Sequence, residues 1–473
     1  MRTEVPPSNS IMGMTRRACD ACSRAIRESR ILHRLALMAA LAAATTGAAG
    51  VAATAPAGAR QLSGGHGNFG RGDGLSGSHG PRHHGHGQHF GPPPAPEGVQ
   101  PIVTGLNQPK KLTVAPDGSL LVALSGDGAA TTDCTTGEEP SCLDESGAID
   151  RVTPGGQVKT LIQGLPSVSS EGEATGPAEA RYMHGGLEVL FQDTNIDPTT
   201  GEEPYGPAGR LLGDLVRFPI FFGFPHIQAS FGPFEAHNNP DGGEGTAIEI
   251  GAESAIDSDP YSFVPYRGGI VVADAAGDDL LFVSPSGAIS VLAVLPTIAE
   301  IAAPGTLGPG QTTPVEIQAQ PVPDSVAVGP DGALYVGELG GAPFGVGASS
   351  VYRVVPGHAP TVYASGFTAI GDIAFDPRGR LLVLEIDQQG LNDPALAAGE
   401  LPTPGAIIGV HRNGAQALLA STGLEFSTGM AVTPQGAVYV SNYGVLPASG
   451  GPGGLSGQVD RVGLASSWTQ TPW

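Results

Sequence analysis

The sequence is poor in charge and almost free of lysine. Only 14% of its 473 residues are charged, and its lysines are Lys110, Lys111 and Lys159. So little charge excludes a coiled coil or a protein built of long surface helices. The net charge of −22 argues against a nucleic-acid partner, because phosphate binding needs a basic face.

The motifs of common catalytic and nucleotide-binding sites are also missing. The sequence has no G-x-S-x-G motif, no P-loop and no G-x-G-x-x-G at a strand-to-helix turn. No apolar stretch with a 3.6-residue period follows the N-terminal region, which excludes a helical domain. Since 40% of the residues are hydrophobic, a sizeable core is still expected, and it must be built of strands.

The N-terminal region resembles an export signal. Arginines precede an uncharged, Ala/Leu-rich run from Leu35 to Ala55, and Ala57-Gly58-Ala59 follows as a small-residue cleavage site. We predict a signal peptide over residues 1–59, with an uncleaved anchor helix as the alternative. The mature protein is then secreted or associated with the cell envelope, and has no transmembrane segment.

Residues 60–97 contain little that a core can bury. Gly, Ser and Pro surround six histidines, a composition typical of a disordered linker. Loosely held imidazoles can bind Zn²⁺, Cu²⁺ or Ni²⁺ weakly, but the simpler interpretation is a tether.

Two cysteines remain after removal of the signal. Cys134 and Cys142 lie close together in the sequence, and an exported chain favours a disulfide between them. Two free thiols are the alternative. The pair Cys19 and Cys22 lies in the predicted signal, where its C-x-x-C spacing is incidental.

The body repeats one pattern, an alternating apolar run, a Pro-x-Gly turn and a second apolar run. Clear copies are Leu112–Leu124, Val326–Val336, Ile373–Leu384 and Ala431–Val440. Proline presets φ and glycine supplies a positive φ, so each copy predicts a β-hairpin. Two further strand-like runs follow most hairpins, and four strands make one propeller blade. We predict six blades, over residues 105–165, 185–258, 259–319, 320–367, 368–424 and 425–464.

The two ends of the repeat region complement each other. The last blade lacks a fourth strand, whereas an unassigned strand, Val99–Val103, precedes the first blade. We therefore predict an all-β, six-bladed β-propeller over residues 98–464. It is closed by pairing the N-terminal strand into the last blade, and a tail covers residues 465–473. A pair of β-sandwiches is the rival fold.

Polar residues recur where the second strand of the blades ends. Aligning the hairpins brings Ser125, Asp274, Glu338, Glu385 and Asn442 to one position. Oxygen ligands suit a hard cation such as Ca²⁺, so we predict a metal site formed by Asp274, Glu338, Glu385 and Asn442. The alternative is that these residue types simply favour turns at strand ends.

Several stretches resemble one family. They include Ser325–Gly340, Asn238–Gly245 and Val272–Leu281, and together they resemble the ScyD/ScyE family over residues 99–464. This resemblance implies an exported six-bladed propeller of the NHL/TolB-like kind without an assigned catalytic activity. The chain departs from the family pattern after Gly186–Leu190, where no Pro-x-Gly turn follows, so the strand pairing of the second blade is open.

Three functions compete. The first is a binding or scaffold module for a protein, glycan or small-molecule ligand, expected to be monomeric. The second is a divalent-metal-dependent hydrolase or lactonase-like enzyme with its site in the central channel, since gluconolactonases share the fold. The third, a quinone-dependent oxidoreductase, has the least support from the residues.

Overall fold

The computed structural model describes most of residues 98–465, together with Trp468. Gaps lie at 131–133, 136–140, 171, 195–202, 221–222, 243–256, 305–311, 392, 394–402 and 452–453. The predicted signal peptide (1–59), the linker (60–97) and most of the predicted tail lie outside the described residues. Within these limits no helix has the length and apolarity needed to cross a membrane.

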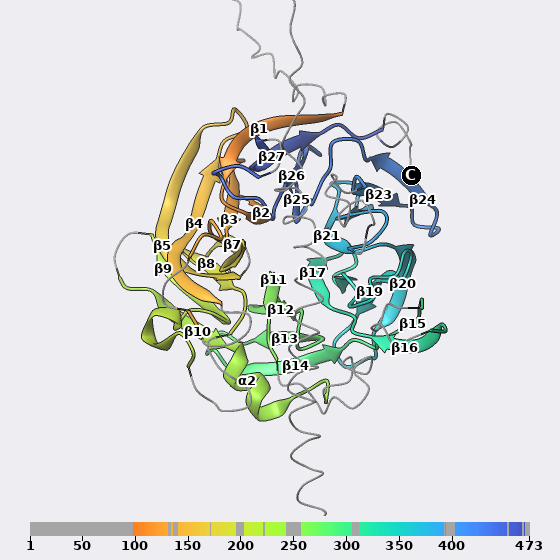
Figure 1. Ribbon diagram of the computed structural model, residues 1–473, viewed down its shortest axis with the longest axis horizontal. Coiled ribbons are helices and arrows are strands. Elements are labelled where there is room, and N and C mark those ends of the chain that lie inside the picture. Colours follow the sequence, from red (N-terminus) through yellow and green to blue (C-terminus); the bar gives the residue numbers. More distant parts are fainter. Residues whose placement is uncertain are drawn as a thin grey trace, which may run out of the picture. The chain divides into compact units, whose positions relative to one another are not determined.

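The described chain is a six-bladed β-propeller, as predicted (Figure 1). The first blade contains β2 (Pro109–Val114), β3 (Leu120–Leu124), β4 (Cys142–Val152), β5 (Val158–Ser170) and the short β6 (Glu173–Thr175). The second contains β7 (Pro177–Met183), β8 (Gly186–Phe191), β9 (Asp214–Pro219) and β10 (His226–Ser230). The third contains β11 (Pro260–Tyr266), β12 (Gly269–Asp274), β13 (Asp279–Val283) and β14 (Ile289–Val294).

The other three blades follow the same plan. The fourth contains β17 (Pro323–Val328), β18 (Leu334–Glu338), β19 (Ser349–Val354) and β20 (Thr361–Phe367). The fifth contains β21 (Ile370–Phe375), β22 (Leu381–Glu385), β23 (Ala406–Val410) and β24 (Gln416–Ala420). The sixth contains β25 (Gly429–Val432), β26 (Val438–Asn442), β27 (Gly457–Val462) and β1 (Val99–Leu106). Figure 1 shows the first strand of each blade facing the centre of the ring.

Ring closure occurs where the sequence predicts it. β1 pairs antiparallel with β27, with Gln100 opposite Arg461 and Val103 opposite Val459. In Figure 1 the orange β1 lies along the blue β27. The inner strands contact one another in a complete cycle, from β2 through β7, β11, β17, β21 and β25 back to β2. Six hydrophobic clusters of the described residues each lie between two neighbouring blades, and Ile149 and Phe191 share the one between the first two blades.

The second and third blades differ from the prediction. The second blade begins at Pro177, not at residue 185, because the turn from β7 to β8 is His184-Gly185, with φ of 47° and 77°. Two residues with positive φ form a tight hairpin turn without proline. Two strands predicted to belong to the third blade, β15 (Ile298–Ala302) and β16 (Val315–Ala319), instead form a separate two-stranded sheet.

Two short helices were not predicted. They are the 3-10 helix η1 (Gly206–Gly209) and the α-helix α2 (Phe231–Asn238). α2 contains glycine and proline and has no apolar period, so it lacks a sequence signature. Tertiary packing supports it, since Phe231 is fully buried in the core of the second and third blades.

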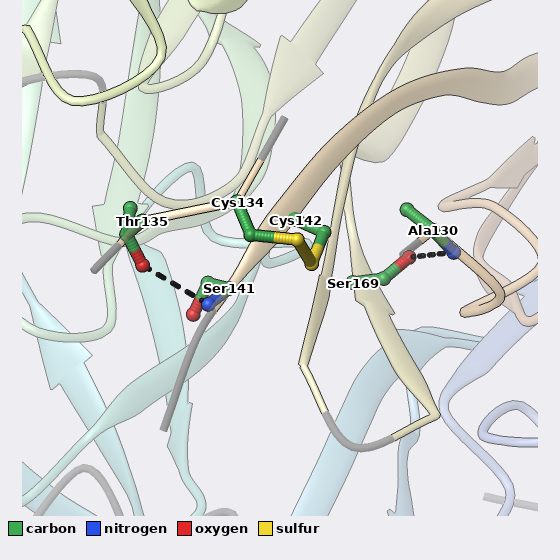
Figure 2. The surroundings of a disulfide bond; sticks show 6 residues. All are labelled: Ala130, Cys134, Thr135, Ser141, Cys142 and Ser169. Carbon is green, nitrogen blue, oxygen red and sulfur yellow. Dashed lines mark hydrogen bonds between the residues drawn. A yellow bond between two sulfur atoms is a disulfide. The ribbon is translucent and has the colours of Figure 1, made fainter. Parts of the chain in front are cut away.

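The predicted disulfide is present. Cys134 and Cys142 are joined through their sulfur atoms, and Cys142 is the first residue of β4 (Figure 2). Beside the bond, the backbone N–H of Thr135 donates to the Ser141 carbonyl oxygen at 2.9 Å. The disulfide therefore ties the segment after β3 to the start of β4.

Closure of the ring is testable at its last strand. Val459 is fully buried in β27, so Val459→Asp places a carboxylate in the closing sheet. We expect the free energy of unfolding in urea to fall by about 4 kcal/mol. The control Gln100→Asp, at an exposed position of β1, should change it by less than about 0.5 kcal/mol. Equal effects of the two substitutions would contradict the closure.

Candidate ligand site at the inner strands

A bulge recurs near the start of five inner strands. The register shifts after the first residue pair of β2, β7, β11, β17 and β21. A bulge redirects the side chain that it carries. Three of these bulges contain polar side chains, namely Lys110 with Lys111 in β2, Tyr261 in β11 and Asp324 in β17. The polar side chains of these three blades therefore occupy equivalent positions, near the start of each inner strand.

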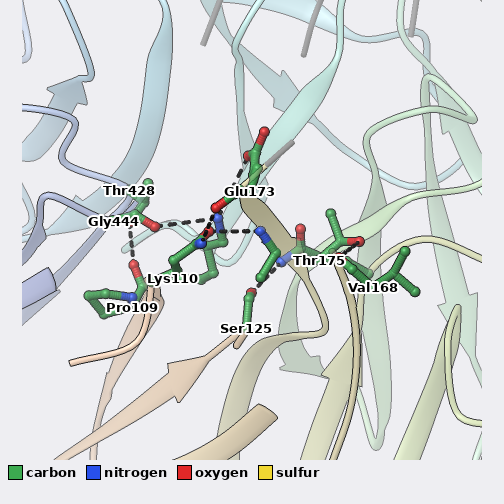
Figure 3. A network of polar contacts seen from close by, with 12 residues as sticks. Pro109, Lys110, Ser125, Val168, Glu173, Thr175, Thr428 and Gly444 are labelled. Carbon is green, nitrogen blue, oxygen red and sulfur yellow. Dashed lines mark hydrogen bonds and ion pairs between the residues drawn. The ribbon is translucent and has the colours of Figure 1, made fainter. Parts of the chain in front are cut away.

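Lys110 is buried within a network of oxygen atoms (Figure 3). Its Nζ donates to the Gly444 carbonyl oxygen at 3.4 Å and lies 3.9 Å from Oε1 of Glu173. Burial lowers the pKa of the Lys110 amine, and the charge of Glu173 opposes this shift. Thr428 fixes the adjacent backbone, because its hydroxyl donates to the Pro109 carbonyl oxygen at 2.7 Å.

Lys111 crosses from the first blade to the fifth. Its Nζ donates to the Gly371 carbonyl oxygen and lies 3.6 Å from Oδ1 of Asp372. The same Nζ lies 5.0 Å from the centroid of the Tyr261 ring in the third blade, within the range of a cation–π contact. Gly429 permits the close approach of β2 to β25, because a Cβ there would lie 2.5 Å from the Lys110 carbonyl oxygen. One side chain thus connects three blades near the centre of the ring.

Asp324 and Tyr261 complete the inner-strand cluster, which we define as Lys110, Lys111, Tyr261, Asp324 and Asp372. Burial raises the pKa of Asp324 to about 7, although the charge of Lys111 opposes it. Burial, reinforced by the charge of Asp324, raises the pKa of Tyr261 well above its usual value. Among the described residues no hydrogen-bond donor contacts the Asp324 carboxyl group, and Asp324 is 6% exposed. Asp324 is therefore the acceptor of the cluster that is left for a ligand.

The predicted metal ligands lie in four different blades, at the ends of second strands: Asp274 in β12, Glu338 in β18, Glu385 in β22 and Asn442 in β26. They bond within their own blades. Oδ1 of Asp274 accepts a hydrogen bond from the backbone N–H of Asp259 at 2.7 Å, just before β11. Oε1 of Glu385 accepts one from the backbone N–H of Thr368 at 2.8 Å, just before β21. Each carboxylate thereby holds the entry to its inner strand.

Asn442 shows the same arrangement, whereas Glu338 interacts with Ser350 of β19 instead. Oδ1 of Asn442 accepts a hydrogen bond from the backbone N–H of Glu425 at 2.8 Å, before β25. Burial raises the pKa of Glu338 to about 8, and its Oε2 has no hydrogen-bond partner in the described chain. The sequence alignment did not include the second blade. There Phe191 takes this position, and the next residue, Gln192, donates through its Nε2 to Oγ of Ser125 at 3.1 Å.

A metal role for these four residues remains a prediction. Across the residues that the structure describes, no three Asp, Glu, His or Cys side chains stand close enough to hold a metal ion as they are. The inner-strand cluster itself was missed, because its members come from separate blades. One feature could have indicated it, since two of the only three lysines are adjacent at the start of a repeat.

No family model matches the chain, and no curated protein matches it. Solved structures do resemble it. One is a putative gluconolactonase, with 10% identity, a TM-score of 0.42, and 78% of this chain and 93% of that chain covered.

Two further solved structures also resemble the chain. Regucalcin from Agrobacterium tumefaciens, a calcium-binding protein, has 10% identity and a TM-score of 0.42, covering 78% of this chain and 94% of that chain. A putative glucose dehydrogenase from Thermus thermophilus has 16% identity and a TM-score of 0.38, covering 77% and 99%.

Proposed function

We propose that this protein is an exported propeller of the ScyD/ScyE kind that binds, without catalysis, a small hydroxyl-bearing ligand such as a sugar. The ligand site is the inner-strand cluster. The observation that carries the proposal is the Asp324 carboxyl group, which is held beside two buried lysines and has no hydrogen-bond donor among the described residues. Its oxygen atoms are therefore available to accept hydrogen bonds from a ligand.

The chemistry of the cluster suits hydroxyl groups. Carboxyl oxygens accept hydrogen bonds from a hydroxyl group, and ammonium groups donate to one, so a sugar can satisfy both kinds of partner. The aromatic face of Tyr261 lies within the same group, although Lys111 already occupies it at 5.0 Å. The absence of a Ser/His/Asp order in the sequence supports binding over nucleophilic catalysis.

The test is a thermal-shift measurement on the full-length protein with glucose, galactose and gluconate. A ligand that binds only the folded state raises the Tm, so we expect at least one of the three to do so. Asp324→Asn should abolish this increment. The matched control Asp331→Asn, in the exposed turn after β17, should keep it. If no sugar shifts the Tm, or if Asp324→Asn responds like the wild type, the proposal is wrong.

A metal-dependent hydrolase is the second candidate. The observation that favours it is the burial of two predicted ligands, which raises the pKa of Glu338 to about 8 and that of Glu385 to about 7. A bound cation would compensate such groups. Hydrolysis of glucono-δ-lactone by metal-loaded protein, lost in Glu338→Gln and Glu385→Gln, would replace the binding proposal with this one.

A further inference from the structure

Buried carboxylates gather where α2 meets the third blade. Glu235 of α2, Asp274 at the end of β12 and Asp279 at the start of β13 are at most 2% exposed. Asp274 and Asp279 face each other across the β12–β13 hairpin as a directly opposed pair. Asp241, which follows α2, is 7% exposed and adds its charge to the group. We call Glu235, Asp241, Asp274 and Asp279 the α2 acidic cluster.

The charges that shift the pKa values of Glu235 and Asp279 are all those of neighbouring carboxylates. Burial raises the pKa of Glu235 to about 8, and the charges of Asp274 and Asp241 raise it further. Burial likewise raises the pKa of Asp279 well above its usual value, and the charges of Asp274, Glu235 and Asp241 reinforce the shift. Like charges in a buried group oppose ionisation unless a cation joins them.

The Asp279 side chain points to a missing ligand. It is fully buried, yet neither of its carboxyl oxygens has a hydrogen-bond partner in the described chain. Asp274 differs, since its Oδ2 accepts a hydrogen bond from the Ser258 hydroxyl at 2.6 Å and its Oδ1 accepts two from backbone N–H groups. Buried polar groups are almost always paired, so two unpaired oxygens on one carboxyl group indicate an absent partner.

Gly277 borders the cluster closely. A Cβ at this residue would lie 3.2 Å from Cγ of Asp274 and 3.5 Å from Oε2 of Glu235. A side chain here would therefore crowd the Asp274 carboxyl group. The φ of Gly277 is not in the left-handed region, so the backbone itself does not require glycine here.

We propose that Asp274, Asp279 and Glu235 bind a hard divalent cation of the calcium class beside Gly277. Carboxylate oxygens are the ligands that Ca²⁺ prefers, and Ca²⁺ tolerates irregular geometry. Since no three described side chains are close enough to hold an ion as they stand, binding draws these carboxylates together. This site goes beyond the proposed sugar-binding function and uses none of the residues of the inner-strand cluster.

The test is calcium titration of the full-length protein after treatment with EDTA, followed by calorimetry and thermal melting. Ca²⁺ is the appropriate ion because imidazole, which is abundant in residues 60–97, is a ligand for softer metals. We expect stoichiometric binding and a rise in Tm. Asp279→Asn should weaken the affinity at least about tenfold. Gly277→Ala should weaken it as well, because its methyl group would crowd and displace the Asp274 carboxyl group.

Controls separate binding from folding. Without calcium, Asp279→Asn should melt no lower than the wild type, because the substitution removes a buried charge. The charge-matched variant Glu316→Gln, at an exposed position of β16, should bind calcium like the wild type. The proposal is overturned if EDTA-treated wild type binds neither Ca²⁺ nor Mg²⁺ at millimolar concentration, or if Asp279→Asn binds like the wild type. Asp324→Asn should keep the calcium response, so the two proposals can fail independently.

Discussion

Raising the pH from 5 to 8 is expected to lower the Tm of this protein. Several buried carboxyl groups lack a nearby cation, and Asp214 is the simplest example. Burial raises its pKa to about 7, opposed only by a hydrogen bond from Ser230. The folded-state pKa lies above the unfolded value, so the stabilisation is complete below about pH 4 and is lost as the pH rises through 7.

The size of the expected loss of stability follows from the pKa shift of Asp214. Each pKa unit corresponds to about 1.4 kcal/mol, so ionised Asp214 destabilises the folded state by up to about 4 kcal/mol at pH 8. Asp214→Asn should therefore be more stable than the wild type at pH 8 and show a flatter dependence on pH. Urea denaturation at several pH values measures both effects.

Asp331→Asn provides the control for the pH experiment. Asp331 is ion-paired with Arg353, with Oδ2 and Nη2 2.7 Å apart, and its pKa is lowered. It titrates below the tested range, so its substitution should leave the slope between pH 5 and 8 unchanged. If the stability of the wild type instead rises over this range, buried ionised carboxylates must be better compensated than the contacts described above indicate.

Loss of Lys111 should produce the second large effect. Lys111→Met removes the buried ammonium group and leaves Asp372 and Asp324 without their nearest cation. Breaking a buried pair from one side costs about 3–5 kcal/mol, and we expect a loss of this size in urea denaturation. Adding Asp372→Asn should recover part of it, because the uncompensated charge is then gone.

The third lysine supplies the matched control. Lys159 is exposed on β5, so Lys159→Met should change the free energy of unfolding by less than about 0.5 kcal/mol. A Lys111→Met variant as stable as Lys159→Met would show that the contacts of Lys111 across the blades contribute nothing to stability.

The parts of the fold that depend on local chemistry were predictable. Proline and glycine at Pro330 and Gly332 specify the turn from β17 to β18, and Gly332 has the expected positive φ of 76°. Ring closure was also predictable, because a missing strand at one end matched an extra strand at the other. The start of the second blade was predicted wrongly, because its hairpin turn is His184-Gly185 and contains no proline.

The candidate site was harder to predict from the sequence than the fold. The alignment correctly brought Asp274 and Asn442 to equivalent strand ends, but Asp274 bonds to the entry of its own blade and Asn442 to Asp460 of its own blade. In contrast, Lys111 meets Gly371, 260 residues away, only because the ring closes. A pattern repeated within blades can be read along the chain, whereas a cluster formed between different blades depends on the three-dimensional arrangement.

The pairing of β1 with β27 has a consequence for biosynthesis. Ribosomes make β1 before all other strands of the ring and β27 after them, yet the two must lie side by side. Until β27 emerges, both sheet edges that will meet are open to other chains. We therefore expect completion of the circle to be a late event, and the interval before it to be the time when the nascent protein most needs a chaperone.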